Sequence, residues 1–240
     1  MSTQPSHNSQ FTIHNFPISA LLFDFGGTLD ADGLPWKERF FRLWTAEGER
    51  VARERFDRAF YAADDALVGA IPESLPLDET AARLARGVAD ALGTADTSLP
   101  GRVSRRFCEE ARQSLSESAR LFERLAPRYR LGVVSNFYGN LAAVCREAGF
   151  EPFLGAAVDS TAAGCRKPDA AIFRTALREL GADVSESVFV GDSRERDMAG
   201  ARGIGMRHVL LAGDSASEGL GACCPGDPVL RRLSDLEALL

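Results

Sequence analysis

The sequence predicts an α/β protein in which a doubly wound parallel sheet carries an inserted α-helical cap domain. Three observations predict this class. Short apolar runs without polar alternation indicate strands that are buried on both faces. Helical patterns of about 10–15 residues separate the later runs, which is typical of βαβ units. A long stretch behind the first run shows helical periodicity alone, which indicates an insertion.

The first strand is expected in ISALLFDF (18–25), where Gly26 and Gly27 follow the apolar run and predict a tight turn. Later apolar runs predict strands over 130–136, 153–160, 187–193 and 206–213. Helical patterns between and after these runs predict helices over 138–149, 169–181 and 196–203, and a final amphipathic helix over 230–240.

The insertion occupies residues 32–116, where apolar residues recur at helical spacing. Residues 18–31 and 117–240 are then expected to form the core domain, and the polar segment 1–17 a disordered tail. The aromatic residues at the start of the insertion are interpreted as cap packing, although they could also line a substrate pocket; they are Trp36, Phe40, Phe41 and Trp44. Several arginines of the insertion either face solvent or recognise a second anionic group; they are Arg39, Arg42, Arg102, Arg105 and Arg106.

Charge and composition exclude several classes of protein. The formal net charge of −6 argues against a general nucleic-acid or membrane-surface binder. No apolar run reaches the roughly 18 residues of a membrane span, and the N-terminus has no secretory pattern. The five cysteines, which include the adjacent Cys223 and Cys224, are expected to be reduced thiols of a cytoplasmic protein. This composition is compatible with a monomer or a homodimer.

Polar residues follow the predicted strands at the edge where parallel α/β sheets bind ligands. Asp24 follows the first strand, Ser135 the second, and Asp192 a late one, with Asp197 five residues further along. Lys167 precedes a predicted helix. Carboxylates from separate loops suit a hard cation such as Mg²⁺, and a lysine, a hydroxyl and backbone N–H groups suit the oxygens of a phosphoryl group.

The ordered motifs FDFGGTL, VVSN, RKPD and VGDSRERD resemble those of the haloacid dehalogenase (HAD) superfamily of hydrolases. The chain is similar to the branch with a helical cap inserted after the first strand. The motifs span residues 24–197 in the family's order, and the resemblance implies a Rossmann-like core.

The resemblance also implies a role for each motif residue. Asp24 is the nucleophile and a Mg²⁺ ligand, Asp192 is a further ligand, and Asp197 completes the metal site by orienting metal-bound water or Lys167. The Gly26 backbone carbonyl is implied as another ligand. The residues implied in holding or balancing the charge of the phosphate are Lys167, Thr28, Ser135, Asn136 and Gly27.

One position departs from the family's phosphatase pattern. Gly26 stands where those enzymes carry a second Asp that acts as general acid and then base. Loss of such a group is expected to slow the reaction by about 10²–10⁴-fold. Asp30, Asp32 and Lys37 lie near enough in sequence to replace it, although Asp32 is also a natural N-cap for the first helix of the insertion.

The sequence leaves other functional interpretations of Gly26 open. The substrate could be an acyl phosphate, whose leaving group needs no acid. It could also be a phosphonate, which similar members of the family cleave through a Schiff base on a lysine. A dehalogenase or a non-catalytic interaction protein also fits the missing Asp. The favoured interpretation is a Mg²⁺-dependent hydrolase that acts on a small phosphorylated metabolite through an aspartyl-phosphate, which should be long-lived unless another residue replaces the missing base.

Overall fold

A computed structural model describes residues 17–213 and 227–240. It contains a six-stranded sheet in the order β3-β2-β1-β4-β5-β6, and every neighbouring pair is parallel. The strands are β1 (Ala20–Phe23), β2 (Arg130–Ser135), β3 (Leu154–Asp159), β4 (Ser187–Gly191), β5 (Arg207–Leu211) and β6 (Val229–Leu230). The predicted α/β class is therefore confirmed. Most of the predicted tail, and both Cys223 and Cys224, lie outside the described residues.

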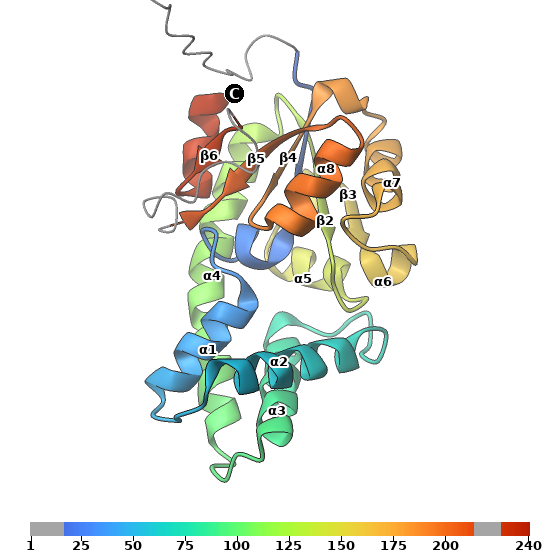
Figure 1. Ribbon diagram of the computed structural model, residues 1–240. Helices are drawn as coiled ribbons and strands as arrows, with labels where there is room; N and C mark the ends of the chain where they lie inside the picture. Colours follow the sequence, from blue (N-terminus) through green and yellow to red (C-terminus); the bar gives the residue numbers. More distant parts are fainter. Residues whose placement is uncertain (1–16, 214–226) are drawn as a thin grey trace, which may run out of the picture.

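Helices cover both faces of the sheet (Figure 1). Successive residues of β1 face opposite sides, as a strand requires: Leu21 and Phe23 belong to one buried apolar cluster, and Ala20 and Leu22 to the other. Helices α4 (Leu99–Leu125) and α5 (Leu141–Glu147) contribute to the first cluster, and α7 (Ala170–Leu180) and α8 (Ala199–Gly203) to the second. Burial on both faces explains why the interior positions of the central strands β1, β2 and β4 are apolar or glycine.

A helical layer lies beyond one end of the sheet (Figure 1). It consists of α1 (Trp36–Ala46), α2 (Arg53–Leu67), α3 (Leu77–Leu92) and the first part of α4, and it is called the cap below. Phe40 and Trp44 are fully buried in this layer and pack the cap as expected, whereas Trp36 also lines the main cavity. The predicted boundary between residues 116 and 117 falls inside α4, a continuous helix of 27 residues.

The predicted final helix over 230–240 is wrong as an α-helix. Residues 229–230 form β6, and Leu233–Leu239 form a 3₁₀-helix, η7. Leu233 and Leu236 are the buried residues of η7, and their spacing of three matches the three residues per turn of a 3₁₀-helix. Over so few residues, this pattern cannot be distinguished from an α-helical one.

The predicted helix over 196–203 also begins differently. A π-helical turn, η5 (Arg194–Met198), precedes α8, and Ser193 is its N-cap residue. The remaining short elements are the π-helical turn η2 (Phe25–Leu29), the short α-helix α6 (Ser160–Ala163) and the 3₁₀ turns η3 (Glu151–Phe153) and η4 (Val184–Glu186). Within the described ranges, no helix combines the length and the apolar character needed to cross a membrane.

Candidate active site

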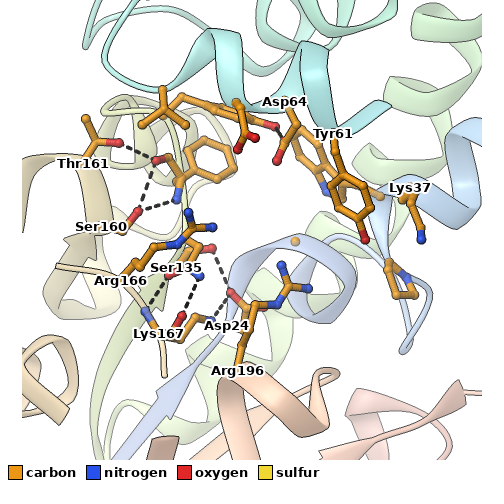
Figure 2. Close-up of a pocket in the computed structure, with 18 of the residues that line it drawn as sticks. Asp24, Lys37, Tyr61, Asp64, Ser135, Ser160, Thr161, Arg166, Lys167 and Arg196 are labelled. Carbon is orange, nitrogen blue, oxygen red and sulfur yellow. Dashed lines mark hydrogen bonds and ion pairs between the residues drawn. The ribbon is translucent and has the colours of Figure 1, made fainter. Parts of the chain in front are cut away.

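A cavity of about 430 Å³ lies between the carboxyl ends of the strands and the cap (Figure 2). The core contributes Asp24, Ser135, Asn136 and Lys167 to its lining, and the cap contributes side chains from α1 and α2. The sheet places the core residues together because β1, β2 and β4 are adjacent and parallel, so their carboxyl ends meet at one edge.

Asp24 lies directly after β1, at the floor of the cavity, and is only 6% exposed. Its Oδ1 atom accepts hydrogen bonds from the Phe25 backbone N–H (2.7 Å) and the Ser135 hydroxyl (2.8 Å). The same Oδ1 lies 2.7 Å from Nζ of Lys167. Three donors therefore fix the carboxylate through one oxygen and leave Oδ2 without a hydrogen bond from the described residues.

Lys167 lies between two carboxylates and is almost completely buried. Its Nζ atom is 2.7 Å from Oδ1 of Asp24 and 2.7 Å from Oδ1 of Asp197. Burial lowers the pKa of this lysine, but the charges of Asp197 and Asp24 more than offset that effect, so the pKa is raised and the ammonium stays charged.

Asn136 positions Lys167 through its backbone. The Asn136 side-chain amide donates from Nδ2 to the Lys167 carbonyl at 3.1 Å, and its Oδ1 accepts from the Lys167 N–H at 2.8 Å. This paired contact occupies both ends of the amide group. The structure therefore gives Asn136 a clear role in holding the lysine loop, while it also lines the cavity.

Asp24, Asp192 and Asp197 form a carboxylate cluster whose ligand atoms lie within 4.8 Å of one another. Both carboxylate oxygens of Asp192 are buried without a hydrogen-bond partner in the described chain. Burial raises the pKa of Asp192 well above its ordinary value, and the negative charges of Asp24 and Asp197 raise it further. A divalent cation that prefers oxygen ligands relieves this cost, so these residues fit Mg²⁺.

Gly27 has no side chain, which lets Asp192 lie close to the loop after β1. Its φ of +89° is a left-handed conformation, and a Cβ atom there would lie 2.5 Å from Oδ2 of Asp192. The Gly27 N–H donates to Oδ1 of Asp30 at 2.7 Å, so it stabilises the loop rather than facing the cavity.

Thr28 is the predicted site residue that the structure places apart. It is buried on another side of the η2 turn, along a small pocket that Asp32 and Ser118 also line. It is not among the residues that line the main cavity.

The structure narrows the choice of a replacement for the missing acid. Asp30 is fully buried, accepts hydrogen bonds from Gly27, Trp36 and Arg39, and does not line the cavity, so it is not placed to protonate a leaving group there. Asp32 accepts from the Leu233 N–H at 2.8 Å, and it does not cap α1, whose N-cap residue is Pro35. The predicted alternative role of Asp32 as the helix N-cap is therefore wrong.

Lys37 is the one suggested replacement that lines the cavity. Its Nζ atom lies 3.3 Å from Asp57 and 4.9 Å from the centre of the Tyr61 ring. Burial lowers its pKa, but hydrogen bonding to Tyr61 and Asp57 outweighs this, so the pKa is raised. Lys37 is therefore a weaker proton donor than an ordinary lysine.

Several functional candidates could not be found from the sequence alone. None of the five cap arginines singled out there lines the cavity, and Arg39 is instead buried 2.6 Å from Asp30. Two core arginines, Arg166 and Arg196, point into the cavity (Figure 2). Their places beside Lys167 and Asp197 in the motifs were the available signal. The sequence did not indicate which cap residues line the cavity, because the packing of α2 decides which of its side chains face inward.

Comparison with known proteins identifies a family for this chain. A family model described as haloacid dehalogenase-like hydrolase matches residues 18–205. The bovine haloacid dehalogenase-like hydrolase domain-containing protein 3 is 38% identical over 84 residues, which are 35% of this chain and 34% of that protein. A glyceraldehyde 3-phosphate phosphatase from Methanothermobacter thermautotrophicus is 36% identical over 85 residues, 35% of this chain and 37% of that protein. The matches thus span about a third of these curated relatives.

A solved structure, the putative HAD-hydrolase YfnB from Bacillus subtilis bound to magnesium, has a similar fold. Its TM-score is 0.60 at 21% identity, and the match covers 94% of this chain and 99% of that chain. The parallel sheet, with a carboxylate cluster and a buried lysine at the carboxyl ends of its strands, places the chain among α/β proteins with a polar site at that edge of the sheet. The chain belongs to the haloacid dehalogenase-like hydrolase family.

Proposed function

We propose that this protein is a Mg²⁺-dependent phosphatase that acts on a small phosphorylated metabolite through an aspartyl-phosphate at Asp24. One observation carries the proposal: a carboxylate held by three donors lies beside the unpartnered, buried oxygens of Asp192. The first feature orients a nucleophile, and the second provides oxygens that suit a divalent cation.

In this mechanism, Oδ2 of Asp24 attacks phosphorus while Lys167 and Ser135 hold Oδ1 and fix the direction of attack. Asp24, Asp192 and Asp197, with the Gly26 carbonyl as the predicted further ligand, would hold the metal. Bound Mg²⁺ supplies positive charge that stabilises the oxygens of the transferring group. A water molecule then cleaves the aspartyl-phosphate and releases inorganic phosphate.

Two arginines that face the cavity support an anionic substrate. Neither Arg166 nor Arg196 forms an ion pair with a carboxylate in the described part of the chain, and both guanidinium groups face the cavity. The similarity to a phosphatase named for a three-carbon phosphate ester supports a small substrate. We also propose that nucleic acids and membranes are not partners, and that the protein works in the cytoplasm as a monomer or homodimer.

The alternatives receive less support from the site. A dehalogenase without a metal would leave the Asp192 oxygens without a role. A Schiff base requires a neutral lysine, but the pKa of Lys37 is raised. A non-catalytic protein remains the competing proposal, and an experiment separates the two.

The test measures phosphate release from p-nitrophenyl phosphate, acetyl phosphate and a panel of sugar phosphates, with Mg²⁺ and without it. We expect metal-dependent release that Asp24→Asn abolishes, and phosphoryl incorporation into the wild-type chain after rapid acid quenching. A folded protein that releases no phosphate from any of these compounds would overturn the phosphatase proposal and support a binding role.

A further inference from the structure

A cap carboxyl group, Asp64, faces the nucleophile across the cavity. Asp64 lies on α2 and points into the cavity from the cap, opposite Asp24 (Figure 2). The Tyr138 hydroxyl donates a hydrogen bond to Oδ1 of Asp64 at 2.5 Å. Tyr138 follows β2 on the core and is buried, so this bond fixes a cap carboxyl group relative to the core. With Oδ1 engaged, Oδ2 is the oxygen on which Asp64 can carry a proton.

The place that a second Asp would normally occupy has no side chain, and it is tightly covered by Trp36. A Cβ atom on Gly26 would lie 3.1 Å from Nε1 of Trp36, and the Trp36 indole is itself held by a 2.7 Å hydrogen bond to Asp30. A proton donor for the leaving group must therefore come from elsewhere on the cavity wall.

The other acidic groups on the wall are less suited. Glu38 pairs with Arg53 and lies 3.8 Å from Lys37. Asp65 is exposed at the rim, and the structure shows no side-chain hydrogen bond that fixes it among the described residues. Asp64 alone among these carboxyl groups is partly buried, anchored to the core and directed into the cavity.

The surroundings of Asp64 favour its protonated form. Burial raises the pKa of the Asp64 carboxyl most, and the hydrogen bond from Tyr138 lowers it. The negative charge of Asp65 raises it further, while Arg196 and Arg166 lower it. The net effect is a raised pKa, which holds a proton at a higher pH than an ordinary aspartate does.

We propose that Asp64, held by Tyr138, is the general acid and then the general base that replaces the missing second Asp. This inference rests on the proposed phosphatase function and adds a catalytic residue to it. In the first step, Asp24 forms a bond to phosphorus, the bond from phosphorus to the leaving oxygen breaks, and Asp64 gives its proton to that oxygen. In the second step, ionised Asp64 takes a proton from water, the water oxygen bonds to phosphorus, the bond between phosphorus and the Asp24 oxygen breaks, and inorganic phosphate and the Asp24 carboxylate are released.

A leaving-group comparison tests the inference. Phenyl phosphate and p-nitrophenyl phosphate present the same ring, but the phenolate leaves poorly without a proton and the p-nitrophenolate leaves well. We expect Asp64→Asn to lower kcat/KM for phenyl phosphate by about 10²-fold or more, and to change kcat/KM for p-nitrophenyl phosphate by only a few-fold. The phosphorylated form of Asp64→Asn should also accumulate with p-nitrophenyl phosphate, because the base for the second step is absent.

Glu54→Gln is the matched control, since it removes an exposed carboxylate of the same helix that does not line the cavity. It should leave both kcat/KM values within about two-fold of wild type. Equal losses on both phosphates in Asp64→Asn, or no loss on either, would overturn the role of Asp64 while Asp24-dependent turnover still supported the phosphatase. Absence of turnover in the wild-type protein would overturn both proposals.

The wild-type pH profile gives a second test that needs no variant. The value of kcat/KM for phenyl phosphate should fall as pH rises through the raised pKa of Asp64, because the acid loses its proton. The value for p-nitrophenyl phosphate should lack that fall.

Tyr138→Phe should move the fall in kcat/KM for phenyl phosphate to higher pH, because the hydrogen bond that favours ionised Asp64 is lost. An unmoved pH profile would contradict the positioning role of Tyr138.

Discussion

Nε1 of Trp36 lies 3.1 Å from the position that a Cβ atom at residue 26 would take, so the indole ring covers Gly26. The same Nε1 donates to Oδ2 of Asp30 at 2.7 Å. Trp36 is buried and packs edge-on against Phe107 and Phe137. The absence of a side chain at residue 26 is therefore part of how the cap meets the nucleophile loop.

This contact predicts that Gly26→Asp alone does not increase phosphatase activity. The new side chain must displace an indole that is held by a hydrogen bond and by two aromatic neighbours, which should destabilise the protein by about 1–3 kcal/mol. Activity against p-nitrophenyl phosphate and the midpoint of thermal unfolding, Tm, measure the two effects. Gly26→Ala, which adds only the Cβ atom, should show a smaller loss of Tm, and a large gain of activity in Gly26→Asp would contradict the prediction.

Loss of one partner of the buried Asp30–Arg39 pair should be costly to stability. Both residues are buried, their charged groups are 2.6 Å apart, and Arg39 also donates to the Phe107 carbonyl at 3.0 Å. Arg39→Met leaves Asp30 without its partner and should lower the free energy of unfolding by about 3–5 kcal/mol. Chemical denaturation measures this loss. Arg42→Met, which removes an exposed arginine paired with Glu110, should cost less than about 1 kcal/mol, and equal losses would contradict the assignment.

The carboxylate cluster predicts a pH-dependent response to Mg²⁺. The pKa of Asp192 in the metal-free folded protein is raised, so the folded state keeps a proton that the unfolded state has released. Stability of the metal-free protein therefore falls as pH rises from the ordinary aspartate pKa through the raised value. Mg²⁺ binds the ionised cluster, so it should raise Tm more at about pH 7.5 than at about pH 5.

Asp192→Asn should remove most of that response. It relieves repulsion with Asp24 and Asp197, so it should raise the Tm of the metal-free protein at neutral pH by about 2–4 °C for each kcal/mol gained. It should also remove most of the increase in Tm that Mg²⁺ produces. Asp90→Asn, on the exposed face of α3, is the control, and an unchanged Mg²⁺ response in Asp192→Asn would argue against this metal site.

The two unpaired guanidinium groups predict a loss of substrate affinity. Arg166→Gln and Arg196→Gln should each raise KM for a phosphorylated substrate by about 10-fold, because a charge-assisted hydrogen bond contributes roughly 1.5–3 kcal/mol. The value of kcat should change less, since neither side chain holds Asp24 or Lys167. Steady-state kinetics on the substrate found by screening measures both constants. Arg146→Gln removes an exposed arginine paired with Glu151, and a similar rise in KM there would show a general charge effect.

The sequence predicted the sheet and the core of the site because both depend on local patterns. Buried strands leave runs such as 130–136, and parallel strands bring Asp24, Ser135 and Asp192 to one edge. The type of helix over residues 230–240 was harder to predict, because the apolar spacings of a 3₁₀-helix and an α-helix differ little over two turns. Asp64 could not be found at all, because its place in the cavity depends on how α2 faces the loop after β2.

The two connections between cap and core differ in stiffness. One is the short loop over residues 30–35, and the other is α4, which runs unbroken from the cap into the core. In the cap, Arg39 holds this helix at the Phe107 carbonyl, and near the sheet Ser118 donates to the Leu29 carbonyl at 2.8 Å. Opening the cavity while both contacts stay intact requires this helix to bend between them. A continuous helix resists bending more than a loop does, so α4 restrains movement of the cap relative to the core.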